Sequence, residues 1–178
     1  QIVSNKIKAG NTHQSPVMFS GNTDTTVIVN NFIRCFNNTN GAVYLSGPGF
    51  IFSHNTVVTE GVGIHAALDI LGDDKLIHNN ILINKKPGLS VYFYPGGFTN
   101  NILDYNCLYT AEGAPLARWE STDCQTLSDW QTQSGQDANS INYMPYFTSD
   151  TDLHTNSYFI DNAGTPLSYV STDIDGED

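Results

Sequence analysis

The sequence is poor in basic residues and in charged residues of any kind. Lys and Arg together number 7 against 18 Asp and Glu in 178 residues, so the formal net charge is −11, and charged residues make up only 14% of the chain. Such an acidic surface excludes a protein that follows nucleic-acid phosphates or lies on an anionic membrane. No apolar run approaches the roughly 20 residues needed to span a bilayer, so no transmembrane segment is predicted.

Cysteine is also scarce, and the short motifs that mark common catalytic centres are absent. The three cysteines, Cys35, Cys107 and Cys124, include no C-x-x-C pair, which argues against a zinc cluster. Their number fits either one disulfide between Cys107 and Cys124, the nearer pair, or three buried thiols. The chain contains no G-x-S-x-G, H-E-x-x-H or P-loop sequence. Its function therefore has to be sought in the overall pattern.

Neutral polar residues supply the polarity instead, and the nineteen Asn include a repeat. An apolar run, one or two Asn and a second short apolar run recur at intervals of 26, 25, 24 and 26 residues. The repeated position is filled by Asn5, Asn31, Thr56, Asn80 and Asn106. The apolar runs alternate with period 2 over part of their length, and Gly-rich turns close each unit. Two or three short strands in 24 to 26 residues are typical of one coil of a solenoid.

This pattern predicts an all-β protein, a parallel β-helix whose coils stack about 4.8 Å apart and whose Asn side chains hydrogen-bond along the stack. The alternative is a β-sandwich, which needs hairpin turns after its strands, whereas Asn-Gly occurs only at residues 40–41. We expect one domain, with coils over residues 1–110 and a C-terminal cap over residues 111–178 on the last coil. Thr126 and Asp129 resemble a capping box, which predicts a short helix over residues 126–133 with Trp130 facing the coils.

In contrast to the C-terminal end, the N-terminal end of the solenoid has no segment in this sequence that could cap it. The chain begins at Gln1 and not at Met, as a processed or excerpted piece of a longer product does. Nothing before Ile2 can cover the first coil. An uncovered solenoid end offers open strand edges for pairing. We therefore expect further coils before Gln1, or a partner chain at that end.

Residues 1–110 resemble the right-handed parallel β-helix repeats of secreted bacterial proteins of the pectate-lyase-like superfamily. The tail is similar to the closing segment of that family, in order, at residues 127–131, 135–141, 145–147, 152–154, 159–164 and 173–176. Two features depart from it. The sequence Ser157-Tyr158-Phe159 stands where Ser-Pro-Ala is usual, and no basic residue follows residues 173–176. The resemblance implies a secreted or cell-surface protein that acts on or binds polysaccharide, as a lyase, hydrolase, epimerase or non-catalytic module.

Aligning the repeats places ionisable side chains on one outward face of consecutive coils. Two positions before the repeated slot stand His54, His78 and Asp104. Two imidazoles and a carboxylate in one row suit acid–base catalysis or a divalent metal. A solvated polar row explains the same residues without any function.

A second face carries aromatic side chains that suit the faces of sugar rings, although such residues are also ordinary strand formers. The candidates for substrate contact there are Tyr44, His65, Tyr92 and Tyr94. Lys85 and Lys86, together with Arg34, are the basic residues near the coils that could hold a uronate carboxylate, and a solvated turn is the alternative for the lysine pair.

Calcium is the one cofactor with candidate ligands. Asp173 and Asp175 offer carboxylate oxygens, and so do Asp69, Asp73 and Asp74 at a coil corner, but the twelve-residue EF-hand pattern is missing. Two functions remain open. A carbohydrate-active enzyme, such as a polysaccharide lyase or glycoside hydrolase, needs the ionisable row and the aromatic face to converge. A binding, adhesion or stalk module does not, and in either case the expected partner is a polysaccharide or oligosaccharide.

Overall fold

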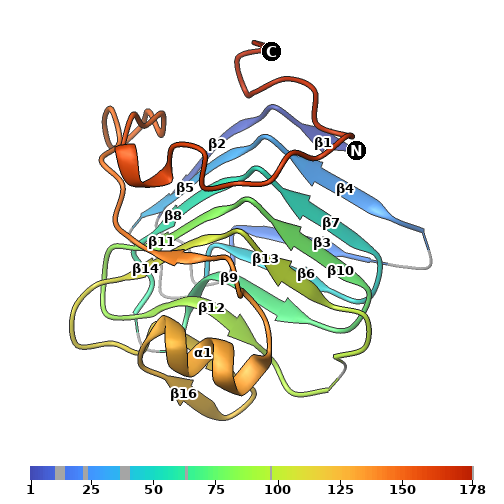
Figure 1. Ribbon diagram of the computed structural model, residues 1–178, viewed down its shortest axis with the longest axis vertical. Coiled ribbons are helices and arrows are strands. Elements are labelled where there is room, and N and C mark those ends of the chain that lie inside the picture. The colour runs from blue at the N-terminus through green and yellow to red at the C-terminus, as the bar shows by residue number, and fades with distance from the viewer. Residues whose placement is uncertain (11–14, 22–23, 37–40, 63, 97, 178) are drawn as a thin grey trace.

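The computed structural model describes residues 1–10, 15–21, 24–36, 41–62, 64–96 and 98–177. They form a parallel β-solenoid of about four turns, which confirms the fold class (Figure 1). Each strand pairs with the corresponding strand of the next coil, so β4 lies between β1 and β7. Among the strands that the structure describes, every pairing is parallel except that of β15 with β16. The β-sandwich alternative, which requires antiparallel hairpins, is therefore wrong.

Three sheets run along the solenoid, and each of the five coils contributes one strand to each sheet, with β16 and β17 of the C-terminal segment added to sheets C and B. Sheet A contains β1 (Ile2–Val3), β4 (Thr26–Val29), β7 (Phe50–Ser53), β10 (Lys75–His78) and β13 (Ile102–Asp104). Sheet B contains β2 (Lys6–Gly10), β5 (Phe32–Phe36), β8 (Thr56–Thr59), β11 (Ile81–Asn84), β14 (Cys107–Thr110) and β17 (Ile141–Asn142). Sheet C contains β3 (Val17–Ser20), β6 (Val43–Ser46), β9 (Ala66–Leu71), β12 (Leu89–Phe93), β15 (Ala117–Trp119) and β16 (Thr122–Cys124). Sheet C thus continues into the segment expected to be the cap.

Apolar side chains from the three sheets stack in the interior of the solenoid. In sheet A, Ile28, Phe52 and Ile77 occupy the same register on consecutive strands, and none is exposed. Because successive side chains point to opposite faces of a strand, the residues before and after each of these three along its own strand face outward. Burying one such side chain contributes about 1.5–3 kcal/mol, so the coils are held together chiefly by this interior. All three cysteines are buried and free, which excludes the Cys107–Cys124 disulfide.

A buried row of asparagines runs along the bend between sheets A and B. Asn31 donates from its backbone N and its Nδ2 to Oδ1 of Asn55, at 3.0 and 2.9 Å. Asn55 donates in the same way to Asn80, and Asn80 to Asn106. The residue before each of these asparagines has a left-handed backbone, with φ between 54° and 58°. The row satisfies the polar groups of a bend that the sheets themselves leave unpaired.

The structure corrects the expected register of this row by one residue in one coil. The slot between Asn31 and Asn80 holds Asn55, because Thr56 pairs with Phe32 and Ile81 at the start of sheet B. The left-handed position before the slot is therefore occupied by His54. The coil from Asn31 is one residue shorter than the alignment assumed.

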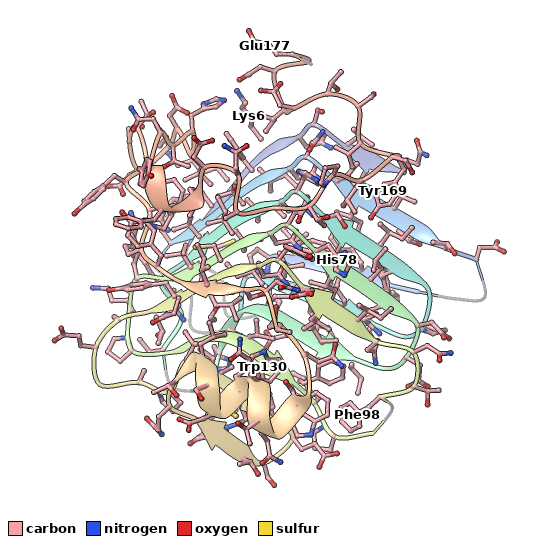
Figure 2. All side chains as sticks on the ribbon, in the orientation of Figure 1. Lys6, His78, Phe98, Trp130, Tyr169 and Glu177 are labelled. Carbon is pink, nitrogen blue, oxygen red and sulfur yellow. The ribbon has the colours of Figure 1, made fainter. Side chains whose placement is uncertain are left out.

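Helix α1 (Leu127–Ser134) closes the end of the solenoid that follows the last coil. Thr126 and Asp129 form the expected capping box. Trp130 is fully buried beneath the helix, 5.8 Å from the ring of Trp119, and its indole Nε1 donates to Oδ2 of Asp137 at 2.7 Å (Figure 2). Nδ2 of Asn106, the last residue of the asparagine row, donates to the other oxygen of Asp137 at 2.9 Å. One buried carboxyl thus joins the cap to the row.

After the cap the chain returns along the outside of the solenoid. It passes through a short 3-10 helix (Tyr158–Ile160) and then crosses the coils toward the first one, so the two termini lie at the same end (Figure 1). We call residues 163–177 the strap. No helix in the described part of the chain has the length and apolar character needed to cross a membrane.

Candidate functional site

The candidate site lies on the outer face of sheet C. The pairing of consecutive strands places one outward residue per coil in a single row, which reads Met18, Tyr44, Asp69, Tyr92 and Arg118. The flanking residues on β9, Leu68 and Ile70, point into the core and are fully buried. This alternation explains why a carboxyl group in an otherwise apolar strand faces outward.

Three tyrosines gather around the middle of this row. The rings of Tyr92 and Tyr94 stack with centroids 3.9 Å apart, and the ring of Tyr44 meets Tyr94 edge-on at 5.8 Å. Tyr92 is 8% exposed, whereas Tyr44 and Tyr94 are half-buried. The guanidinium of Arg118 lies 5.7 Å from the centre of the Tyr92 ring, and its Nε pairs with Oδ1 of Asp123 at 2.5 Å. Aromatic faces and a cation therefore meet on one patch of the surface.

Asp69 is buried beneath these rings although it lies on the outward side of the strand. It is 3% exposed, and its Oδ1 has no hydrogen-bond partner among the described residues. Burial raises the pKa of Asp69 well above the ordinary value and so favours the protonated acid. Burial, and then Asp69, also raises the pKa of Tyr94. A Cβ on Gly41 would lie 1.8 Å from Oδ2 of Asp69, so the carboxyl fills the space that a side chain at position 41 would need.

The expected row of His54, His78 and Asp104 is only partly formed. His78 and Asp104 are paired in register on β10 and β13, but the position beside His78 on β7 belongs to Ser53. His54 lies at the bend instead, where its Nε2 is 2.9 Å from Nδ2 of Asn79. The shift follows from the one-residue correction of the asparagine register.

The ionisable groups of this row do not converge on the tyrosines. Asp104 accepts hydrogen bonds from the backbone N and the Nδ2 of Asn139 in the cap, at 2.7 and 2.8 Å. Both ring nitrogens of His78 are buried without a partner among the described residues. Burial lowers the pKa of His78 despite the opposing effect of Asp104, and it lowers the pKa of His54 as well. Sheet A therefore shows no assembled acid–base pair.

The other expected binding residues have contacts elsewhere. Lys85 follows β11 of sheet B and pairs with Asp150 of the tail at 2.8 Å. The backbone N of Lys86 donates to Oδ1 of Asn84 in the adjoining turn. His65 precedes β9, its carbonyl accepts from Leu89, and burial lowers its pKa. The structure thus brings Tyr44, Tyr92 and Tyr94 together and gives these three residues other surroundings.

Asp173 and Asp175, two of the expected calcium ligands, are engaged within the protein. Asp173 accepts from the backbone N of Asp175 and of Glu177, each at 2.9 Å, and Asp175 pairs with Lys6 and His154. In the described part of the chain, no group of three or more His, Cys, Asp or Glu is placed to hold a metal ion. Of the three corner carboxylates, Asp69 is the one that faces the tyrosines.

Sequence reasoning missed two members of the tyrosine patch. Arg118 lies beyond the last recognised coil, and only the pairing of β15 with β12 brings it beside Tyr92. Asp69 was considered only as an oxygen ligand at a corner. Its outward position between Leu68 and Ile70 was readable from strand alternation.

Comparison with models of known protein families, with curated proteins and with solved structures found no match to this chain. The pectate-lyase-like resemblance therefore has no support from a matching family, and the parallel β-solenoid is what the structure shows.

Proposed function

We propose that this protein binds polysaccharide on the outer face of sheet C. The observation that carries the proposal is the tyrosine patch, in which Tyr44, Tyr92 and Tyr94 surround a buried carboxyl group with an unpartnered oxygen. Aromatic faces shed water when apolar C–H groups pack on them, and sugar rings present such groups. Sugar sites also need a few placed polar groups, and Arg118 supplies one beside the Tyr92 ring.

The row of outward residues on sheet C runs along the solenoid axis, which indicates how a bound polymer would lie. Tyr44, Asp69, Tyr92 and Arg118 belong to four consecutive coils, and adjacent strands are about 4.8 Å apart. That rise is close to the length of one sugar unit in an extended chain. A polysaccharide lying along the solenoid axis would place one unit over each coil, with Arg118 at one end. A secreted or cell-surface location accompanies the proposal, because such polymers are found there.

A second candidate function is catalysis on the same polymer, as a lyase, hydrolase or epimerase. One observation favours it. Asp69 is held toward its protonated form, as the general acid of a glycosidase is. In that case Asp69→Asn should abolish turnover while leaving sugar affinity within about twofold of wild type. A pure binding or adhesion module shows no turnover before or after the change.

The binding proposal is tested by titrating neutral and acidic oligosaccharides into the protein and measuring binding by calorimetry and NMR. Tyr94→Ala and Tyr44→Ala, which remove the two half-buried rings of the patch, should each weaken binding about two- to tenfold, since an aromatic contact contributes roughly 0.5–1.5 kcal/mol beyond its buried area. Tyr146→Ala is the control, because Tyr146 is 79% exposed and lies in the tail. Affinity that survives both sheet C changes, or that is lost in the control, would place the ligand elsewhere.

A further inference from the structure

The strap is fastened to the bend between sheets A and B by asparagine side chains. Nδ2 of Asn79 donates to the carbonyl of Thr165 at 2.6 Å, and Oδ1 of Asn79 accepts from the backbone N of Thr165 at 2.9 Å. Two coils closer to the N-terminus, Nδ2 of Asn30 donates to the carbonyl of Thr172 at 2.5 Å. Both asparagines occupy the left-handed positions that precede the buried row. The same two side chains thus serve the bend of the coil and the attachment of the strap.

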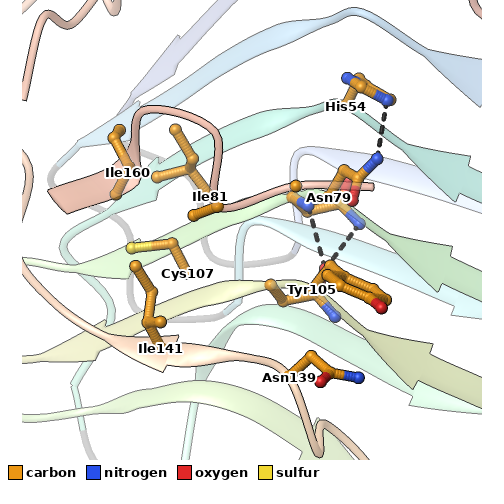
Figure 3. A pocket seen from close by; sticks show the side chains of 12 residues that line it. His54, Asn79, Ile81, Tyr105, Cys107, Asn139, Ile141 and Ile160 are labelled. Carbon is orange, nitrogen blue, oxygen red and sulfur yellow. Dashed lines mark hydrogen bonds between the residues drawn. The ribbon is translucent and has the colours of Figure 1, made fainter. Parts of the chain in front are cut away.

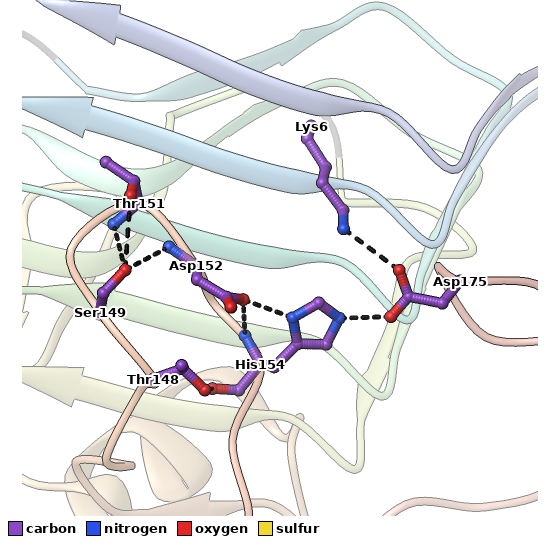
Figure 4. A network of polar contacts seen from close by, with 7 residues as sticks. All are labelled: Lys6, Thr148, Ser149, Thr151, Asp152, His154 and Asp175. Atoms are coloured by element: carbon purple, nitrogen blue, oxygen red, sulfur yellow. Dashed lines mark hydrogen bonds and ion pairs between the residues drawn. The ribbon is translucent and has the colours of Figure 1, made fainter.

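The remaining contacts are on the neighbouring coils. The hydroxyl of Tyr169 lies 3.3 Å from Oγ of Ser53. Near the first coil, Asp175 pairs with Lys6 at 3.1 Å and with Nε2 of His154 at 2.6 Å (Figure 4). From Thr165 to Asp175 the strap therefore makes one polar attachment to each coil that it crosses.

These attachments hold the strap without burying it. Every described residue from 163 to 177 is exposed or half-buried, and none is fully buried. In this part of the chain the structure describes no strand, so no ladder of backbone hydrogen bonds joins the strap to a sheet. Segments with few buried apolar contacts open at a low free-energy cost, independently of the core.

A groove runs beneath and beside the strap. A pocket of about 230 Å³ is lined by Ala163 and Gly164 of the strap and by His54, Asn79 and Tyr105 of the coils. Figure 3 shows the coil side of this pocket, with His54, Asn79 and Tyr105 labelled. A second pocket, of about 520 Å³, lies between residues 170–174 of the strap and the side chains of Phe32 and His54. His54 and Ile81 line both pockets, so the two pockets adjoin at these residues, and we call them together the groove.

The charges of the strap and the groove are complementary. The strap contains Asp173, Asp175 and Glu177 and no Lys or Arg. The first coil presents Lys6 beside it, and His154, whose other ring nitrogen pairs with Asp152, faces Asp175 from the other side. In a chain with only seven basic residues, this end of the groove favours an acidic segment.

We propose that the strap is a detachable cover and that the groove beneath it is a docking site for one extended acidic peptide segment. The strap itself is the resident occupant. The asparagines recognise the backbone of the segment, and Lys6 and His154 recognise a carboxylate near its end. The site is separate from the tyrosine patch on sheet C.

The first experiment tests detachment in the full chain. Asn30→Gly combined with Asn79→Gly removes both amide anchors, and glycine adopts the left-handed backbone without strain. Protection of the strap amides from hydrogen exchange should fall about tenfold or more, the loss expected for one or two hydrogen bonds, while the amides of Asn55 and Asn80 stay protected. Asn100→Gly, at a left-handed corner that contacts Asp74, is the matched control and should change neither.

The second experiment tests docking with the groove intact. The double change Thr165→Pro and Asp175→Lys alters only strap residues: it removes the backbone N–H that donates to Asn79 and the carboxylate that pairs with Lys6. The groove residues Asn30, Asn79 and Lys6 are unchanged. A synthetic peptide of residues 163–178 should then return the NMR signals of His54 toward their wild-type positions. The same peptide carrying both changes should bind at least about tenfold more weakly.

Three results would overturn the proposal. One is a strap that stays protected without its asparagine anchors. Another is a strap that opens only together with the amides of the asparagine row, which would make it part of the core. The third is a wild-type peptide that leaves His54 unaffected at millimolar concentration.

Discussion

At the residue scale, Asp69 links the tyrosine patch to the pH dependence of stability. Burial raises its pKa above the ordinary value of 3.8. An acid whose pKa is raised on folding supports the folded state below its unfolded pKa, and this stability is lost as the pH rises through the folded pKa. Asp69→Asn cannot ionise, so it should gain stability relative to wild type as the pH rises. Urea unfolding at a series of pH values measures the difference.

Asp161→Asn serves as the control for that series, since Asp161 is exposed in the tail. A constant offset between Asp69→Asn and wild type would show that Asp69 has the same pKa in the folded and unfolded chains.

The corrected asparagine register gives a second prediction at this scale. Asn55→Ala should cost about 2–4 kcal/mol, because it leaves Asn31, Asn80 and the carbonyls that Asn55 holds without partners in a buried place. Thr56→Ala should cost about 1 kcal/mol or less, because no hydrogen bond of its side chain joins the row. Equal costs for the two changes would contradict the register.

The one-residue error in the asparagine row, Thr56 for Asn55, shows how much of the register repeat spacing alone can determine. The sequence His54-Asn55-Thr56 fits the repeated slot at either of its last two residues, and coil lengths of 24 and 25 are both ordinary. Spacing located the bend and the axis correctly. Choosing between Asn55 and Thr56 needed the pairing of Thr56 with Phe32 and Ile81, which is a contact between coils.

At the scale of the element, the cap depends on one aromatic side chain. Trp130 fills the end of the solenoid beneath α1, against Trp119 and the buried carboxyl of Asp137. Trp130→Ala should cost about 3–5 kcal/mol, the usual range for a buried large aromatic. Urea denaturation measures the loss. A cost below about 1 kcal/mol would mean that α1 is a loose appendage and that the last coil is stable without it.

Elements differ in how far the sequence predicts them. The strands of sheets A and B follow from local alternation, and α1 follows from Thr126 and Asp129. Tyr44, Tyr92 and Tyr94 were placed on one face by the same alternation. The strap was not predictable in this way, because its contacts join residues 86 and 142 positions apart and no period marks them. Arg118 was missed because the coil count stopped one strand too early.

At the scale of the whole molecule, a solenoid is nearly one-dimensional, since each coil contacts only its neighbours. The inner coils pack on both sides, and the last coil packs on α1 and Asp137. In the described structure the first coil has a neighbour on one side only, formed by β4, β5 and β6, and Asn5 is exposed. An additional attachment is the ion pair of Lys6 with Asp175, which is exposed to solvent and therefore weak.

In the chain of residues 1–178 studied by itself, local stability should therefore rise along the axis from the first coil toward the cap. In native-state hydrogen exchange, the amide of Asn5 should exchange fastest, that of Asn31 more slowly, and those of Asn55 and Asn80 slowest, at the rate of global unfolding. Each of these amides donates to the asparagine of the next coil at 3.0 Å, so their hydrogen bonds are equivalent and only the packing differs. Lys6→Gln should accelerate Asn5 and leave Asn80 unchanged. A single common rate for all four amides would instead mean that the solenoid opens only as one cooperative unit, with the first coil as stable as the capped end.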